Sequence, residues 1–283
     1  MAAFTNQATL SYNRGTTTSN VVTGELVEVL SAAKTAVTDT YEKGGKITYI
    51  ISVVNSGATG YTGLTITDDL GSYTVGTSTF VPLDYVDGSI HYYIGGTEQT
   101  APAVTAGPPM TVTGISVPAG GNAVIIYEAR VNGTAPLAAE SGILNTAEIS
   151  GGGITPITVT ETVNASAEPR LTISKAICPS TVVENGQVTY TFVIQNSGNI
   201  AAVAADGITV SDTFDPVLDN ISVTLDGTAL ALTTDYTYDE TTGAFATVPG
   251  RITVPAASFA QNAETGEYAV TPGVAVLTVT GTV

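Results

Sequence analysis

Two segments of this chain, 141 residues apart, have nearly the same pattern. Residues 46–57 are KITYIISVVNSG and residues 187–198 are QVTYTFVIQNSG, and each follows a glycine turn. The alternation of apolar and polar residues is typical of a β-strand with one buried face, and the closing Asn-Ser-Gly is a turn signal. A repeat of this quality predicts two copies of one structural unit, which constrains the fold more than any other feature of the sequence.

The repeat extends well beyond this strand. GLTITDD (63–69) matches GITVSDT (207–213), ISVPA (115–119) matches ITVPA (252–256), and AVIIYEARV (123–131) matches VAVLTVTGT (274–282). A lysine also precedes each asparagine by 21 residues, with Lys34 before Asn55 and Lys175 before Asn196. All of these segments read as strands, so the sequence predicts an all-β protein.

The composition agrees with this prediction. Thr, Val, Ile and Tyr recur along the chain, Gly and Pro punctuate it, and hydrophobic residues make up 43%. Long runs of strong helix formers are absent, which favours strands. A length of 283 residues suggests about two domains.

The charge excludes several classes of partner. The formal net charge is −17, with only eight Lys and Arg residues, so the chain repels the phosphates of nucleic acids and of anionic membranes. The simplest role of the acids is to keep an exposed surface hydrated. No stretch of about 18 apolar residues exists, so we expect no membrane span. With Cys178 as the single cysteine, no intrachain disulfide can form.

The repeated unit resembles an immunoglobulin-like bacterial surface repeat, the domain of unknown function number eleven. The resemblance rests on Lys-Thr-Ala at 34–36, GGKITYIISVVNSG at 44–57, LTITDDL at 64–70 and NTAEI at 145–149, and it covers nearly the whole chain. It implies two tandem immunoglobulin-like β-sandwich domains in a cell-surface or appendage protein. It names no ligand, because a fold alone does not fix a function.

The two copies are cut at different places. The first continues with ILNTAEIS (143–150) and ITVTETV (157–163), while the second has no such segments after its last matched strand. A match to ILNTAEIS lies instead at the N-terminus, in FTNQATLS (4–11). The matched pairs are Phe4 with Ile143, Asn6 with Asn145, Ala8 with Ala147 and Leu10 with Ile149. Alternation places Phe4, Asn6, Ala8, Leu10 and Tyr12 on one face of a strand.

We therefore predict a donor strand and linker at 1–20, a first domain at 21–168, and a second domain at 169–283 that lacks its closing strand. A sandwich without that strand exposes an unpaired edge, which an extended segment can fill by strand addition. If the N-terminus of a neighbour fills it, the contact joins two different surfaces and builds a head-to-tail polymer. This resembles donor-strand assembly of surface or spore appendages. The alternatives are a strand folded back onto its own second domain, a swapped dimer, or a disordered N-terminus.

Each unit also carries a lysine, an aspartate and an asparagine in matching places. The trios are Lys34, Asp68 and Asn145 within the first domain, and Lys175 and Asp212 with Asn6 of the next subunit. They resemble the Lys–Asn isopeptide sites of Gram-positive pilins and adhesins. A buried lysine with a lowered pKa can attack the amide, and a protonated aspartic acid can polarise that amide. Tyr49 and Tyr190 would shield the two sites. The alternative is a strand-edge lysine, a turn-capping aspartate and a hydrogen-bonding asparagine.

No other motif indicates chemistry. His91 is the single histidine and supports neither a catalytic triad nor a metal site, and we expect a small apolar role for Cys178 or a disulfide between subunits. Calcium at acidic stretches such as 84–88 and 212–220 is the one ion left open. We expect no enzyme activity, no cofactor and no metal.

The sequence thus predicts a structural subunit of an extracellular fibre on a cell or spore surface, whose partner is another copy of itself. The other function left open is a surface adhesin or ligand-binding module with specificity in its loops. The N-terminal residues lack the basic region and apolar stretch of a signal peptide, so we expect a leader outside this sequence or another route, such as lysis of a spore-forming cell.

Overall fold

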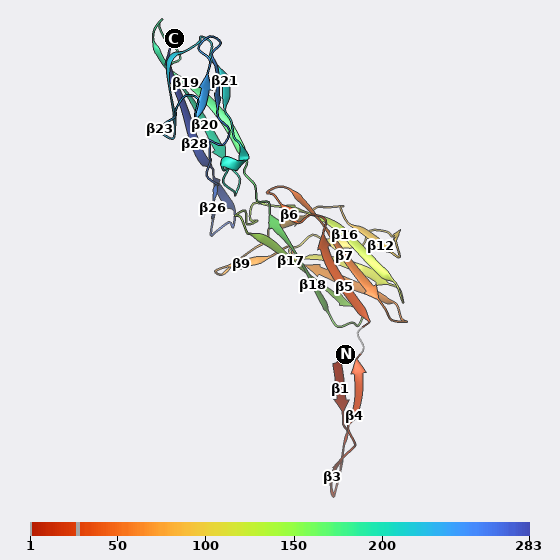
Figure 1. Ribbon diagram of the computed structural model, residues 1–283. Coiled ribbons are helices and arrows are strands. Elements are labelled where there is room, and N and C mark those ends of the chain that lie inside the picture. The colour runs from red at the N-terminus through yellow and green to blue at the C-terminus, as the bar shows by residue number, and fades with distance from the viewer. Residues whose placement is uncertain (1, 27–28) are drawn as a thin grey trace.

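The computed structural model describes residues 2–26 and 29–283. In these residues the regular structure is strand throughout, apart from one short 3-10 turn, η1 (Ala204–Asp206). Figure 1 shows two sandwiches in sequence and a slender hairpin at the N-terminus. The all-β prediction is confirmed.

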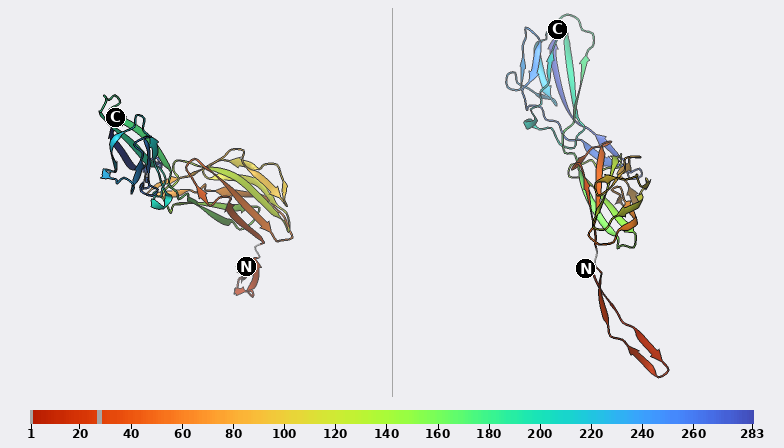
Figure 2. Two further views of the ribbon diagram at one scale, coloured as in Figure 1. Left: turned by 45° about the horizontal axis from the view of Figure 1, so that its top comes forward. Right: turned by 90° about the vertical axis from the view of Figure 1, so that its right-hand side faces the viewer.

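The N-terminal hairpin, residues 2–26, stands apart from both sandwiches (Figures 1 and 2). It consists of β1 (Ala2–Asn6) paired with β4 (Val22–Leu26) and of β2 (Thr9–Tyr12) paired with β3 (Gly15–Thr18), both antiparallel. The side chains of residues 3–23 are all exposed. The predicted donor strand is therefore interrupted at Gln7 and Ala8 and has partner strands of its own within the chain.

The first sandwich, residues 30–165, consists of two sheets. One contains β13 (Thr97–Glu98), β12 (His91–Ile94), β16 (Asn122–Val131), β7 (Lys46–Asn55) and β5 (Leu30–Ala36) in that order, and β11 (Leu83–Tyr85) also pairs with β16. The other contains β14 (Ala103–Thr105), β15 (Met110–Val117), β8 (Tyr61–Asp68), β17 (Gly142–Gly151), β18 (Ile157–Ala165) and β6 (Thr40–Tyr41). A small hairpin, β9 (Tyr73–Val75) with β10 (Ser78–Phe80), extends from it.

The alternation seen in the sequence packs this sandwich. In β7, Ile47, Tyr49, Ile51 and Val53 are buried, because every second residue of a strand faces the same way. β16 pairs with β7 along its whole length and adds its own buried residues to the same core. On one side of the sandwich β5 lies next to β18, although the two strands belong to different sheets. This side contains the predicted Lys–Asp–Asn trio.

The second sandwich, residues 171–282, has a smaller second sheet. Its main sheet runs β19 (Leu171–Cys178), β20 (Gln187–Asn196), β28 (Gly273–Thr282), β22 (Asp219–Leu225) and β23 (Thr228–Ala229). The other has only β21 (Ser211–Thr213), β25 (Ala244–Thr247) and β24 (Tyr236–Tyr238), and β26 (Ser258–Gln261) forms a hairpin with β27 (Tyr268–Thr271). Its core is separate from that of the first sandwich. The domain boundaries themselves remain a prediction.

The matched segments 63–69 and 207–213 differ in length as strands. β8 covers eight residues and has partners on both sides, β15 and β17. β21 covers three residues and, within the described chain, pairs with β25 alone. A strand edge without a partner leaves its N–H and C=O groups unsupported, which accounts for the shorter strand.

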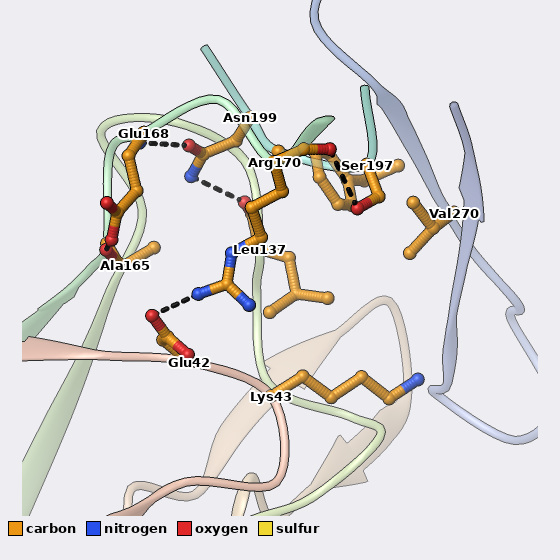
Figure 3. Close-up of a pocket in the computed structure, with 12 residues that line it drawn as sticks. Glu42, Lys43, Leu137, Ala165, Glu168, Arg170, Ser197, Asn199 and Val270 are labelled. Atoms are coloured by element: carbon orange, nitrogen blue, oxygen red, sulfur yellow. Dashed lines mark hydrogen bonds and ion pairs between the residues drawn. The ribbon is translucent and has the colours of Figure 1, made fainter. Parts of the chain in front are cut away.

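The two sandwiches meet at a joint that Figure 3 shows in close-up. An ion pair joins Arg170 to Glu42, and Asn199 Nδ2 donates to the carbonyl of Leu137 at 3.0 Å. These groups line a small pocket between the sandwiches. Nearby, the β26–β27 hairpin contacts the first sandwich through Gln261 Nε2, which donates to the Tyr73 hydroxyl at 2.7 Å.

The Asn-Ser-Gly turn is built alike in both copies. Asn55 Nδ2 donates to the carbonyls of Thr59 (2.8 Å) and Pro118 (3.0 Å), and its Oδ1 accepts from Gly57 N at 2.9 Å. Asn196 makes the same three bonds to Ile200, Pro255 and Gly198. Both asparagines are buried, so each side chain replaces backbone partners that a turn cannot provide.

We expect Asn55→Ala to lower the free energy of unfolding by about 2 kcal/mol or more, because it leaves buried polar groups unpaired. Urea unfolding followed by tyrosine fluorescence measures this, since the chain has no tryptophan and 13 tyrosines. The control is Ser56→Ala, an exposed neighbour whose hydroxyl donates to the Val29 carbonyl at 3.0 Å, and it should change the value by about 1 kcal/mol or less. Equal effects of the two substitutions would contradict the assigned role of Asn55.

Candidate functional site

The first trio is assembled across the two sheets. Lys34 lies in β5 of one sheet, while Asp68 ends β8 and Asn145 lies in β17 of the other. β17 pairs with β8 so that Ala147 faces Asp68, and Asn145 is two residues away on the same face. All three side chains are buried, with exposed fractions of 4% for Lys34 and 0% for the other two residues.

Asp68 is the centre of this site. Its Oδ2 accepts from Lys34 Nζ at 2.7 Å and from the Tyr127 hydroxyl at 2.6 Å, and its Oδ1 accepts from Leu70 N at 3.0 Å. The Tyr49 ring lies 5.0 Å from Lys34 Nζ, as the sequence led us to expect of a shielding aromatic. Tyr49 and Tyr127 stack with their ring centroids 5.5 Å apart and exclude water from the ion pair.

Asn145 is connected to Asp68 through a residue that the sequence analysis missed. Its Nδ2 donates to the Tyr127 hydroxyl at 3.2 Å, so Tyr127 stands between the amide and the carboxylate. We had expected Asp68 to act on the amide directly. Asn145 Oδ1 and the Tyr49 hydroxyl have no hydrogen-bond partner within the described residues. A buried amide oxygen without a partner is costly, so this placement of the Asn145 side chain calls for a specific explanation.

Burial governs the titration of these groups. It lowers the pKa of Lys34, and this outweighs the carboxylates of Asp68, Asp69 and Glu161, which raise that pKa. Burial also raises the pKa of Tyr127 well above its ordinary value, with a further contribution from Asp68. A lysine of lowered pKa is more readily the neutral amine, which is the form that can act as a nucleophile.

The second trio is half assembled. Lys175 of β19 and Asp212 of β21 form an ion pair, but their side chains are 40% and 20% exposed. The Tyr190 ring lies 4.5 Å from Lys175 Nζ, and Phe192 and Phe214 lie at 5.5 and 5.4 Å. Asn6 is in the N-terminal hairpin, away from this site (Figure 1). The structure thus brings together two of the three predicted residues.

The exposure of Lys175 is shared by its whole strand, because every residue of β19 is exposed. Leu171, Ile173 and Ile177, on the same face as Lys175, are 39%, 57% and 43% exposed. Their counterparts in β5 are Leu30, Ala32 and Ala36, which pack against the first core. β18 lies beside β5, and no described strand occupies that place beside β19. We call β19 and β21 together the acceptor edge.

The remaining candidates have simple environments. His91 is exposed in β12 and pairs with Glu98 at 2.8 Å. Cys178 is exposed at the end of β19. Across residues 2–26 and 29–283, no three His, Cys, Asp or Glu side chains gather as metal ligands would. No helix in the same residues is of a length and hydropathy suited to crossing a bilayer.

Lys34 and Lys175 are a matched pair that shows how burial changes the contribution of a lysine–aspartate contact to stability. We expect Lys34→Met to destabilise the first sandwich by about 3–5 kcal/mol, because it removes the lysine nitrogen that donates to the buried Asp68. Lys175→Met should cost about 1 kcal/mol or less, because its ion pair is partly in water. Chemical denaturation of both variants checks this. A similar loss in both would mean that the two ion pairs do not differ as their exposures indicate.

The sequence matches no protein-family model and no curated protein. Among solved structures, the chain is similar to the pilus backbone of Streptococcus pneumoniae (14% identity, TM-score 0.36), with 86% of this chain and 55% of that chain covered. It is also similar to the major pilin subunit of Bacillus cereus (14%, 0.35; 96% and 73% covered). A third is the collagen-binding domain of a Staphylococcus aureus adhesin (10%, 0.31; 49% and 99% covered). The chain thus spans 55% of the length of the pneumococcal protein. TM-scores this low do not support an inference about function.

Proposed function

We propose that this protein is a structural subunit of an extracellular fibre on a cell or spore surface. Subunits join head to tail when the N-terminal strand of one, residues 2–12, adds to the acceptor edge of the next. The observation that carries the proposal is the difference between the two sandwiches. The first has β17 beside β8, and the described part of the second leaves the matching edge of β21 unpaired.

The sequence match gives the register of this contact. Asn6 and Ala8 correspond to Asn145 and Ala147, and Ala147 faces Asp68 across the β17–β8 ladder. A donor strand in the same register places Ala8 opposite Asp212. Asn6 then occupies the place of Asn145, next to the ion pair of Lys175 and Asp212. The exposed Phe4 and Leu10, at 59% and 64%, become buried in the neighbour.

The geometry favours a contact between subunits over closure within one chain. The donor and the acceptor edge are different surfaces, so the contact is heterologous and repeats from subunit to subunit. The N-terminal hairpin and the second sandwich also lie at opposite ends of the molecule (Figure 1 and the right view of Figure 2). For the strand to close on its own second sandwich, it would have to cross the whole first sandwich.

Ala8→Glu and Thr9→Glu test the donor strand, because they place the same side chain on its two opposite faces. Ala8 corresponds to Ala147, which is fully buried, so a glutamate there should abolish polymerisation. Thr9 corresponds to Glu148, an exposed glutamate of β17, so Thr9→Glu should polymerise normally. Negative-stain imaging and sedimentation report the outcome, and deletion of residues 2–13 should match Ala8→Glu. Normal fibres from the deletion, or isolated particles from the unchanged protein, would overturn the proposal.

We further propose that both trios form Lys–Asn isopeptide bonds. The neutral amine of the lysine attacks Cγ of the asparagine, a C–N bond forms, the former amide C–N bond breaks, and ammonia leaves. One proton passes from the lysine nitrogen to the departing nitrogen, with Asp68 and Tyr127 as the hydrogen-bonding groups at hand in the first site. The dry surroundings and the lowered pKa of Lys34 support this role.

Intact mass is the direct measurement. A protein whose first site has reacted weighs about 17 Da less than its sequence predicts, the mass of ammonia lost on displacement at the amide. We expect this deficit in the unassembled chain from Lys34 and Asn145 alone. Asn145→Ala and Asp68→Ala should restore the full mass. An unchanged protein at its full sequence mass would rule out the bond in the first sandwich.

A further inference from the structure

The free hairpin repeats the pairing of two strands of the first sandwich. In β1 and β4, Asn6 pairs with Val22 and Phe4 with Gly24. In β17 and β18, Asn145 pairs with Glu161 and Ile143 with Val163. Each residue of the first set lies 139 positions before its counterpart in the second. Both strands of the hairpin therefore correspond to β17 and β18 in one common register, although the sequence match had identified only the first strand.

The correspondence holds along the base of the hairpin and slips by one residue towards its tip. Thr9 pairs with Thr18, where the common register would have paired it with Ser19. The slip occurs where Ser19 N donates to the Ala8 carbonyl at 2.9 Å and Gln7 Nε2 donates to the Ser19 carbonyl at 2.7 Å. Asn6 lies in the regular half, whereas Ala8 and Thr9, which correspond to the ladder positions opposite Asp212 and Ser211, lie at and beyond the slip.

In the first sandwich, β18 covers the side on which Lys34 is buried. It lies beside β5 and continues into a parallel bridge with β6, where Asn164 pairs with Thr40 and Ala165 with Tyr41. A single added strand would complete the edge of β21 but would leave β19 uncovered, with Ile173 and Ile177 still facing water. Within residues 171–283, the acceptor edge has no counterparts of β17 and β18.

Side-chain size supports the same arrangement. β19 carries Ile173 and Ile177 where β5 carries Ala32 and Ala36, so the acceptor edge is bulkier than its counterpart. The hairpin carries Gly24 where β18 carries Val163, and it carries Phe4 where β17 carries Ile143. An exchange of volume between facing strands keeps the packing density of a core. In the free hairpin the Phe4 ring lies over Gly24, where an added Cβ would stand 2.4 Å from Phe4 Cζ.

We infer that the donor is the preformed two-stranded hairpin, residues 2–26, which enters the neighbouring subunit as one unit. β1 and β2 add to β21, and β4 lies beside β19 as β18 lies beside β5. Val22 then takes the place that Glu161 holds near Lys34, so the site around Lys175 receives an apolar residue in place of a carboxylate. This inference rests on the proposed function and specifies the partner of its acceptor edge.

Disulfide trapping locates each strand of the hairpin separately. The bridge of Asn164 with Thr40 corresponds to Glu25 of one subunit with Thr181 of the next, and paired backbone positions lie within the Cα separation that a disulfide accepts. The ladder pair Glu148 with Thr67 likewise corresponds to Thr9 with Ser211. Chains carrying E25C alone and T181C alone, each with C178S, are mixed, polymerised and oxidised with diamide. The same is done with T9C and S211C.

We expect both pairs to give a cross-linked dimer of chains, identified by mass spectrometry as a disulfide-linked peptide that reduction removes. The matched control is V21C with T181C, because residue 21 lies four residues, or about 13 Å, along the hairpin from residue 25. It should give no cross-link. Cross-linking of T9C with S211C but not of E25C with T181C would overturn the hairpin inference and leave strand addition standing. Fibres that cross-link through neither pair would overturn both.

Discussion

Every strand in a sandwich needs a neighbour for its backbone groups, and this requirement explains most of what distinguishes the two halves of the chain. In the first sandwich β17 satisfies β8, and β18 then shelters β5. In the second, β21 is reduced to three residues and β19 is exposed along its whole length. The two copies of the repeat thus form one sandwich with a paired edge and one with an unpaired edge. The difference lies in whether further strands are present beside that edge.

The buried charges follow from that closure. Lys34 and Asp68 form an ion pair in a dry, aromatic surrounding only because β17 and β18 exclude water from it. Lys175 and Asp212 form the corresponding ion pair in partial contact with water, since no described strand takes the places of β17 and β18 beside them. Electrostatic interactions and nucleophilicity both depend on this difference in surroundings. The proposed bond chemistry is therefore a property of the closed sandwich rather than of the lysine alone.

Much of this could be predicted from the sequence, because the repeat compares the protein with itself. The strands, the Asn-Ser-Gly turns and the meeting of Lys34, Asp68 and Asn145 are local patterns or matched positions. Tyr127 was missed because Val279, which takes its place opposite Tyr190, lacks a ring, so the repeat gave no signal for it. The second strand of the hairpin was missed for a similar reason. Val22 and Gly24 do not resemble Glu161 and Val163, and only the pairing register, a non-local property, relates them.

The paired state of the hairpin affects how quickly subunits can join. A disordered tail of this length would lose backbone freedom on docking, at about 1–2 kcal/mol for each residue ordered. In this protein β1 to β4 are already paired before any encounter, so most of that entropy has been lost during folding of the single chain. What remains is the collision of two subunits, each with a formal net charge of −17. Fibre growth should then depend on ionic strength, since salt screens the repulsion between approaching subunits.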